Sequence, residues 1–309
     1  MPHKTDWFLE AKWGVFIHLL NGVQNKPGHP ANMGAGETGW SGFVGSLDAE
    51  RLAAQAAETG AGYLFLTLMQ RSRHLLAPNA TFDRITGYKP GEACARRDFV
   101  ADMITALDKY NIPLCLYFTG DGPLDDPRAG PAFGYVSQSD KVSFGFVEKW
   151  ASVAREYSLR YGAKIRAWWM DGCYPPLGYD EARLKILADA VRAGNPDTLA
   201  AMNKGVETTV SAYSASDDFT TGEMNDFAGE PPSRFINGAQ WHALSFLGVP
   251  PPGAHPSEGW GRPGSKYTGA QLRGYVARAN ARGGVVTIDV CLRRDSSIDP
   301  AQMEVLRGL

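Results

Sequence analysis

Short apolar runs that alternate with amphipathic helical stretches constrain the fold of this 309-residue chain more than any other feature. The runs are rich in Val, Ile, Leu, Phe and Tyr and nearly continuous in apolarity, which is typical of parallel strands buried on both faces. We predict strands, in chain order, at residues 13–19, 63–68, 113–118, 165–170, 198–202, 218–221, within 235–246, and at 284–290. Repeated strand–helix alternation of this kind predicts a parallel sheet with right-handed crossovers.

Helical periodicity separates most of these runs. Asp48 is the expected N-cap and Gly60 the expected end of a helix over 49–59. Further helices are predicted at 97–110, 139–161, 179–193, 269–281 and 299–306. The helical pattern fails over 203–237, so we expect helices to be missing from the later half of the fold.

Eight strands in a chain of this length favour a closed (β/α)8 barrel, which needs roughly 250 residues plus insertions. We therefore predict an irregular TIM-like barrel of the α/β class that occupies residues 1–309 as a single catalytic domain. An open doubly wound sheet is the alternative. No G-x-G-x-x-G follows the first strand and no G-x-x-x-x-G-K-[ST] occurs, so a nucleotide-binding version of that sheet is not supported.

Composition excludes several classes of protein. Lys and Arg number 31 against 33 Asp and Glu, and this balance lacks the basic footprint of a nucleic-acid-binding protein. No apolar run approaches the ~20 residues of a membrane span, and the first residues lack an apolar signal core, so we expect no membrane insertion and a cytoplasmic location. The six His show no H-x-H or H-E-x-x-H spacing and the four Cys no C-x-x-C pair, so we expect neither a metal site nor a cofactor.

Polar and aromatic residues follow most of the predicted strands, and catalytic groups of a barrel gather at those ends. In chain order they are His18; Gln70, Arg71, Arg73 and His74; Tyr117 and Asp121; Trp169 and Asp171; Asn203 and Lys204; Glu223 and Asp226; Trp241 and His242; and Asp289. Asp171 is the most informative, because a charge directly after a buried strand and beside two Trp costs desolvation energy unless it has a role or a partner. A helix N-cap or a loop salt bridge is the structural alternative for this residue.

A carboxylate next to tryptophan suggests sugar chemistry. Glycosidases need two carboxyl groups, one that attacks or stabilises charge and one that donates a proton to the leaving oxygen. Asp171 is the first candidate, and candidates for the second are Glu223, Asp226, Glu230 and Glu258. Large aromatics in loop-like sequence either stack on a ligand or cap the barrel core; they are Trp40, Tyr174, Tyr179, Trp241 and Trp260.

Five segments carry motifs of one known family in the right order along nearly the whole chain. They are 6–18, similar to W-F-x-x-A-K-F-G-x-F-I-H-W-G; 60–67, similar to A-G-A-K-Y-x-x-L-T; 96–118, similar to K-R-D…G-L-Y-Y-S; 168–172, similar to W-x-D-G; and 283–302, similar to G-G-N-L-L-L-N-V-G-P…I-P-x-x-Q. Together they resemble the catalytic domain of glycoside hydrolase family 29, the α-L-fucosidases.

The resemblance implies an irregular barrel and a retaining mechanism in which Asp171 attacks the anomeric carbon. The stretch that ends at Glu223 is similar to the family's D-F-x-T-P-E, which implies Glu223 as the acid/base. His18 and Tyr117 match positions that hydrogen-bond the sugar, and Trp169 matches a wall of the pocket.

Other positions depart from the family pattern. Residues 70–73 read Gln-Arg-Ser-Arg where the family has H-H-D-G-F. Because Arg suits contact with a carboxylate or phosphate, one expectation is that Arg71 contacts an anionic substituent of the substrate, and the other is that it forms a salt bridge within the loop. Residues 203–205 replace N-D-R and 240–243 replace part of W-E-x-C-M-T. We expect no C-terminal β-sandwich of the kind that many members carry. The expected sugar-binding residues are His18, Gln70, Arg71, Tyr117, Trp169, Asn203, Trp241, His242 and Trp260.

We therefore predict a retaining, exo-acting glycoside hydrolase for an α-linked sugar in a small oligosaccharide or glycoside, a sugar that need not be fucose. A carbohydrate-binding pseudoenzyme on the same barrel is the alternative, and it gains support if no second carboxyl approaches Asp171 to glycosidase distance. A hydrolase or lyase of different chemistry is a third hypothesis, which metal ligands near Asp171 would favour.

Overall fold

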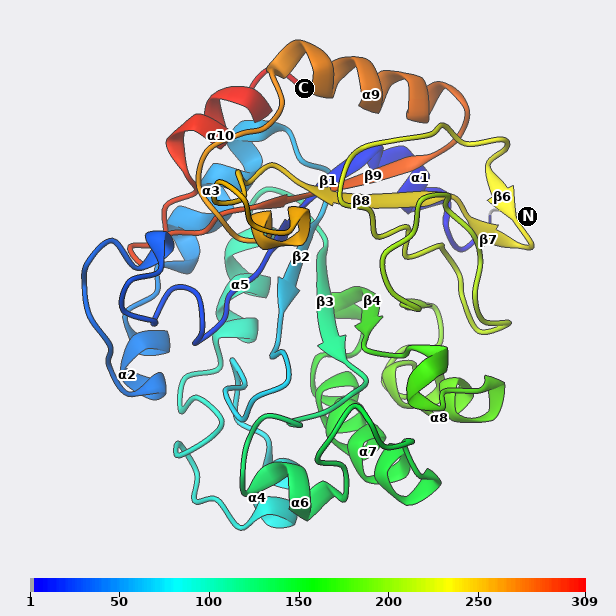
Figure 1. Ribbon diagram of the computed structural model, residues 1–309. Coiled ribbons are helices and arrows are strands. Elements are labelled where there is room, and N and C mark those ends of the chain that lie inside the picture. Colours follow the sequence, from blue (N-terminus) through cyan, green and yellow to red (C-terminus); the bar gives the residue numbers. More distant parts are fainter. Residues whose placement is uncertain (1–2) are drawn as a thin grey trace.

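Parallel strands form the centre of the molecule. The computed structural model describes residues 3–309, in which seven strands build one sheet in the order β5-β4-β3-β2-β1-β9-β8, with every neighbouring pair parallel. Their bounds are Trp13–Ile17 for β1, Leu64–Thr67 for β2, Leu114–Thr119 for β3, Ile165–Asp171 for β4, Leu199–Met202 for β5, His242–Phe246 for β8 and Val285–Val290 for β9. The sheet curls, with helices between its strands, into the irregular α/β barrel that the sequence predicts (Figure 1).

The two edge strands of this sheet, β5 and β8, are bridged by the irregular segment 218–224. Its backbone bonds both edges, because Asp218 N donates to Ala200 O on β5 and Leu244 N on β8 donates to Gly222 O, each at 2.8 Å. The Asp218 side chain accepts from Ala200 N at 2.9 Å, in place of a backbone carbonyl. Gly222 has a φ of +53°, and a Cβ there would lie 2.1 Å from a β8 carbonyl oxygen. The expected sixth strand therefore fills its place in the barrel without forming a regular ladder.

The region 235–246 holds a hairpin as well as the single strand expected there. β6 (Phe235–Ile236) and β7 (Ala239–Gln240) pair antiparallel, and β8 follows directly. Asn237 and Gly238 between them both have positive φ, which is the conformation of a type I′ turn and the reason that Asn-Gly suits it. This hairpin shifts the start of the barrel strand to the end of the predicted region.

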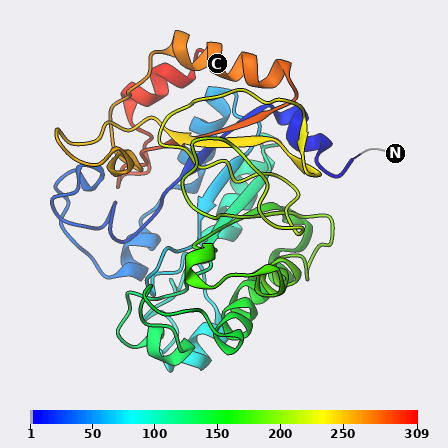
Figure 2. The same ribbon diagram turned by 45° about the vertical axis from the view of Figure 1, so that its right-hand side comes forward.

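Helices pack on the outside of the sheet (Figures 1 and 2). The predicted ones appear as α3 (Ala49–Thr59), α5 (Phe99–Asp108), α7 (Phe144–Tyr161), α8 (Glu181–Val191), α9 (Gly269–Ala281) and α10 (Pro300–Leu306). Four short helices were not predicted from the sequence: α1 (Asp6–Ala11), α2 (Trp40–Gly45), α4 (Ala80–Thr86) and α6 (Ala129–Phe133). α7 starts later than predicted because Ser143 caps it by accepting from Phe146 N at 3.1 Å. Residues 203–234 contain no helix, as expected.

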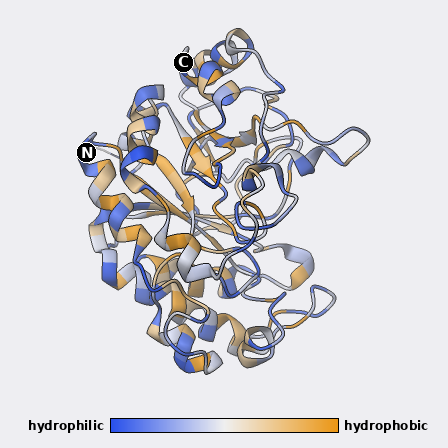
Figure 3. Ribbon diagram, turned by 90° about the vertical axis from the view of Figure 1, so that its left-hand side faces the viewer, coloured by the Kyte–Doolittle hydropathy of each residue, from blue (hydrophilic) through white to orange (hydrophobic). Residues whose placement is uncertain are grey.

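Two hydrophobic clusters hold the barrel together. One lies between the strands and the outer helices and contains residues such as Val15, Leu66 and Trp150. The other fills the barrel interior with aromatic side chains, among them Phe16 and Phe65. Figure 3 shows the central strands coloured as hydrophobic and the surrounding helices as a mixture of both kinds, which is the pattern of helices with one buried face. None of the helices in residues 3–309 is long and apolar enough to span a bilayer.

Candidate active site

A cavity of about 280 Å³ opens at the carboxyl ends of the barrel strands. Its lining residues are Phe16, His18, Leu20, Val23, Gln70, Tyr117, Trp169, Asp171, Glu223, Leu244, Ser257 and Trp260. They come from the ends of strands β1 to β4 and β8 and from the loops that follow them, which is where barrels carry their binding groups.

Asp171, the last residue of β4, receives hydrogen bonds on both carboxylate oxygens. The Tyr117 hydroxyl donates to Oδ2 at 2.5 Å, and the Tyr174 hydroxyl donates to Oδ1 at 3.0 Å. The Asn203 amide Nδ2 also donates to Oδ1, at 2.9 Å. Neutral donors that converge on one carboxylate stabilise its charged form and fix its orientation.

Glu223 enters the same cavity from the irregular segment 218–224. Asn203 Nδ2 donates to its Oε2 at 2.6 Å, so one amide nitrogen bridges Glu223 and Asp171. The bridged oxygens can therefore be no more than about 5.5 Å apart. Burial and the nearby charge of Asp171 raise the pKa of Glu223 to about 7, against which the Asn203 hydrogen bond acts. A carboxyl with a raised pKa thus lies beside one that accepts three neutral hydrogen bonds, and such a pair can divide acid and nucleophile roles.

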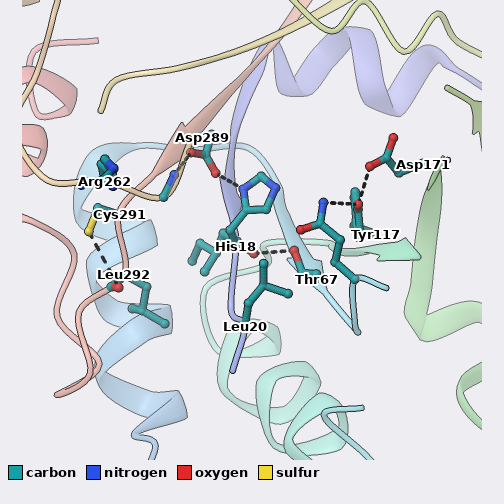
Figure 4. Close-up of polar contacts among 12 residues, drawn as sticks. His18, Leu20, Thr67, Tyr117, Asp171, Arg262, Asp289, Cys291 and Leu292 are labelled. Atoms are coloured by element: carbon teal, nitrogen blue, oxygen red, sulfur yellow. Dashed lines mark hydrogen bonds and ion pairs between the residues drawn. The ribbon is translucent and has the colours of Figure 1, made fainter. Parts of the chain in front are cut away.

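His18 is held at the other side of the cavity by Asp289 on β9. Its Nδ1 lies 2.6 Å from Asp289 Oδ1 (Figure 4). Gly261 N donates to Oδ2 of the same carboxylate at 2.8 Å. Burial disfavours the charged imidazole, but Asp289, together with the charges of Asp171 and Glu223, outweighs it and raises the pKa of His18. Asp289 thereby fixes the ring and ties down the loop that carries Trp260, whose ring centroid is 5.5 Å from that of His18.

Aromatic rings form the floor and wall of the cavity. Tyr117 and Trp169 stack with centroids 5.5 Å apart and planes at 16°, and Phe16 meets both edge-on. Trp260 packs on Phe246 at 4.7 Å. These rings offer flat apolar surface beside the polar groups, which is the combination that a sugar ring requires.

Most of the predicted site residues meet in this cavity. Those that line it are His18, Gln70, Tyr117, Trp169, Asp171, Glu223 and Trp260, and Asn203 contacts both carboxyl groups. Arg71 does not line it. Its guanidinium lies 2.9 Å from Asp125 and 3.7 Å from Asp121, so the loop salt bridge rather than a free anion contact describes this residue.

Trp241 and His242 do not reach the cavity, which corrects their expected place. β8 runs from His242 to Phe246, and His242 pairs with Val285, the first residue of β9. Both residues therefore lie at the amino ends of the strands, opposite the cavity. His242 is fully buried, with Nδ1 2.8 Å from Thr220 O and Nε2 2.6 Å from Thr287 Oγ1.

Several residues in or beside the cavity stand outside the expected set of sugar-binding residues. Tyr174 and Asp289 act on the charged groups, and the aliphatic or small lining residues are Leu20, Val23, Leu244 and Ser257. Asp289 did carry a signal, because it stands near the end of the eighth predicted strand. The only sequence signal for Tyr174 was an aromatic side chain in a loop after Asp171.

The charge of the cavity is carried by carboxylates and by His18. Of the described residues that line it, none is Lys or Arg. Within residues 3–309 no group of three or more His, Cys, Asp or Glu side chains is placed to hold a metal ion.

No protein-family model matches this sequence, and a search of curated proteins finds no match. Solved structures do match. A family 29 α-L-fucosidase from Bacteroides thetaiotaomicron, trapped as a covalent intermediate, has a TM-score of 0.66 and 13% identity over 100% of this chain and 74% of that chain. The α-L-fucosidase AlfC from Lactobacillus casei, in complex with α-L-fucose, has a TM-score of 0.65 and 18% identity, and the match covers 99% of this chain and 96% of that chain.

A second family of glycoside hydrolases matches as well. An endo-fucoidan hydrolase from glycoside hydrolase family 107 has a TM-score of 0.70 and 13% identity, and the match covers 99% of this chain and 53% of that one. At identities this low the likeness establishes the fold: the chain has the barrel fold of the family 29 α-L-fucosidases, in a divergent sequence.

Proposed function

We propose that this protein is a retaining glycoside hydrolase that removes a terminal α-linked sugar, with Asp171 as nucleophile and Glu223 as acid/base. The observation that carries the proposal is the pair of carboxyl groups bridged by Asn203 in one cavity, one stabilised as an anion and the other with a raised pKa. This is the division of states that glycoside cleavage demands.

The spacing of the two carboxyl groups supports retention of configuration. Retaining enzymes hold them about 5–5.5 Å apart, whereas inverting enzymes need about 6.5–9.5 Å to admit a water molecule. The shared Asn203 nitrogen limits one oxygen of each carboxyl group to a separation of about 5.5 Å or less, which is compatible with the first class.

The reaction follows from these positions in two steps. A carboxylate oxygen of Asp171 attacks the anomeric carbon, the glycosidic bond breaks, and the leaving oxygen takes the proton of Glu223. Glu223, now ionised, then removes a proton from water, whose oxygen displaces Asp171 from the sugar carbon. The second step returns both carboxyl groups to their starting states.

The lining of the cavity supports an uncharged sugar as substrate. A carboxylate or sulfate on the sugar would find no Lys or Arg among the described lining residues, and it would meet Asp171 instead. The volume lies near the lower limit of ~300 Å³ for small-molecule pockets, which suits one sugar ring and hence exo action. Because the structurally similar AlfC binds α-L-fucose, an α-L-fucoside is the first substrate to test.

The pseudoenzyme hypothesis loses its main support, because Glu223 does approach Asp171. Turnover therefore decides between the two hypotheses.

A panel of aryl glycosides, including α-L-fucosides, α-galactosides and their furanose forms, tests the proposal. We expect Asp171→Asn to abolish turnover with little change in thermal unfolding. Glu223→Gln should slow glycosides with poor leaving groups far more than activated aryl glycosides, because only the former need the acid. Asp226→Asn is the control for Asp171→Asn. It makes the same substitution at an exposed carboxylate that pairs with Lys266, and the variant should retain activity.

Three results would contradict the proposal. Unchanged turnover in Asp171→Asn would remove the nucleophile, and an equal loss on both leaving-group classes in Glu223→Gln would place the acid elsewhere. Proton NMR of the first product formed should show the anomer of the substrate, and the opposite anomer would exclude a retaining mechanism.

A further inference from the structure

Gln70 stands at the start of a chain of hydrogen bonds that ends on Asp171. Its amide Nε2 donates to the Tyr117 hydroxyl at 2.9 Å, and that hydroxyl donates to Asp171 Oδ2 at 2.5 Å (Figure 4 shows the second contact). All three side chains line the same cavity.

The direction of this chain is fixed by chemistry. An ionised carboxylate can only accept, so the single proton of the Tyr117 hydroxyl must point to Asp171. The phenol oxygen can then only accept from Gln70, which places Nε2 rather than Oε1 against it. Burial and the charge of Asp171 both raise the pKa of Tyr117, so the phenol remains a donor.

An uncharged amide donates to the Tyr117 hydroxyl without titrating. A carboxylate at position 70 would compete with Asp171 for the Tyr117 proton, and an imidazole would change its role with pH. Hydrogen bonds in a chain polarise one another, so donation by Gln70 strengthens the bond from Tyr117 to Asp171. Gln70 Oε1 bonds no described residue and stays available to a hydroxyl of a ligand.

We propose that Gln70 is a positioning residue that acts on Asp171 through Tyr117. This role rests on the proposed function. Gln70 keeps the proton of the Tyr117 hydroxyl directed at Asp171 and thereby favours the orientation in which the Asp171 carboxylate attacks the sugar. The role belongs to a residue at which the chain departs from the family 29 pattern.

A double-mutant cycle tests the proposal on the full-length protein. The variants are Gln70→Met, which keeps the side-chain length but removes the donor, Tyr117→Phe, and the two combined. The readout is the 13C resonance of the Asp171 carboxyl at one neutral pH, assigned by its loss in Asp171→Asn. Gln271→Met makes the same change at an exposed position on α9 and serves as the control.

We expect Gln70→Met to move the Asp171 resonance in the parent and to have no further effect when Tyr117 is already Phe, because the effect travels through the phenol. On any glycoside that the parent hydrolyses, Gln70→Met should lower kcat about tenfold, and again not in the Phe background. Thermal unfolding of each variant shows that it is folded.

An unmoved resonance in Gln70→Met, or an equal movement in both backgrounds, overturns the proposal. The resonance does not depend on turnover. If the parent hydrolyses no glycoside, the proposed function fails while the cycle still decides whether Gln70 acts through Tyr117.

Discussion

Asn203 is the residue whose removal best tests the arrangement of the two carboxyl groups. Its side chain is fully buried, and its Nδ2 donates to Asp171 at 2.9 Å and to Glu223 at 2.6 Å. Asn203→Leu keeps the volume close to that of the amide and removes both donors. The variant therefore changes the hydrogen bonding of the pair with little change in packing.

The expected effect on Glu223 has a definite sign. The Asn203 hydrogen bond acts to lower the pKa of Glu223, so its loss raises that pKa further above its present value of about 7. The bond to the ionised form exceeds that to the neutral form by roughly 1.4 kcal/mol, which corresponds to about one pH unit. Because the acid must be protonated to work, the alkaline limb of the pH profile of kcat/KM should move from near 7 to about 8.

The loss of a donor from Asp171 lowers the rate at the same time. A hydrogen bond to a charged group contributes about 1.5–3 kcal/mol, so kcat/KM at the optimum should fall by about 10- to 150-fold if the transition state keeps that bond. The assay is hydrolysis of the best aryl glycoside between pH 5 and 9. An alkaline limb that stays in place or moves to lower pH would refute the assigned coupling of Asn203 to Glu223.

Two further predictions concern stability. Burial lowers the pKa of His242 to about 4, whereas a histidine in the unfolded chain titrates near 6.5. As the pH falls, the unfolded state therefore binds the proton first. The free energy of unfolding should fall by about 3 kcal/mol between pH 6.5 and pH 4. His242→Gln should flatten this slope in urea unfolding, and an unchanged slope would show that His242 is not its source. Gly172→Ala should cost about 1–3 kcal/mol, because φ is +64° and a Cβ would lie 2.8 Å from Asp121 Oδ1 and 3.0 Å from its backbone N. Gly134→Ala, with φ of +88° and no atom within 4 Å of its Cβ, measures the backbone strain alone, and equal urea midpoints for the two variants would exclude the clash.

Local sequence determines the regular elements of this barrel. The strands are continuous apolar runs, and the best-predicted helix begins and ends where its own residues dictate: Asp48 accepts from Arg51 N at 2.9 Å, and Gly60 adopts a φ of +78°. Both signals act within a few residues, so they can be read without the fold. The place of Asp171 at the end of β4 follows in the same way from the run that precedes it.

Local signals of this kind did not predict at which residues the strands begin and end. The turn at Asn237 and Gly238 makes a hairpin within 235–246, and this alone moves His242 from the carboxyl end of a strand to its amino end. A shift of a few residues along a parallel strand changes which rim of a barrel a side chain faces. The sequence contained the turn, but its consequence depended on the register of β8 against β9.

The sequence by itself determined an α/β barrel with a carboxylate at the end of its fourth strand, because apolar periodicity and capping are properties of neighbouring residues. Only the tertiary structure decided which groups share the cavity. The bond between His18 and Asp289 joins residues 271 positions apart. Asn203 donates to Glu223 on the irregular segment 218–224, and Arg71 is neutralised by Asp121 and Asp125. Such pairs form when the sheet curls and brings the ends of distant strands to one rim, so no local pattern of residues specifies them.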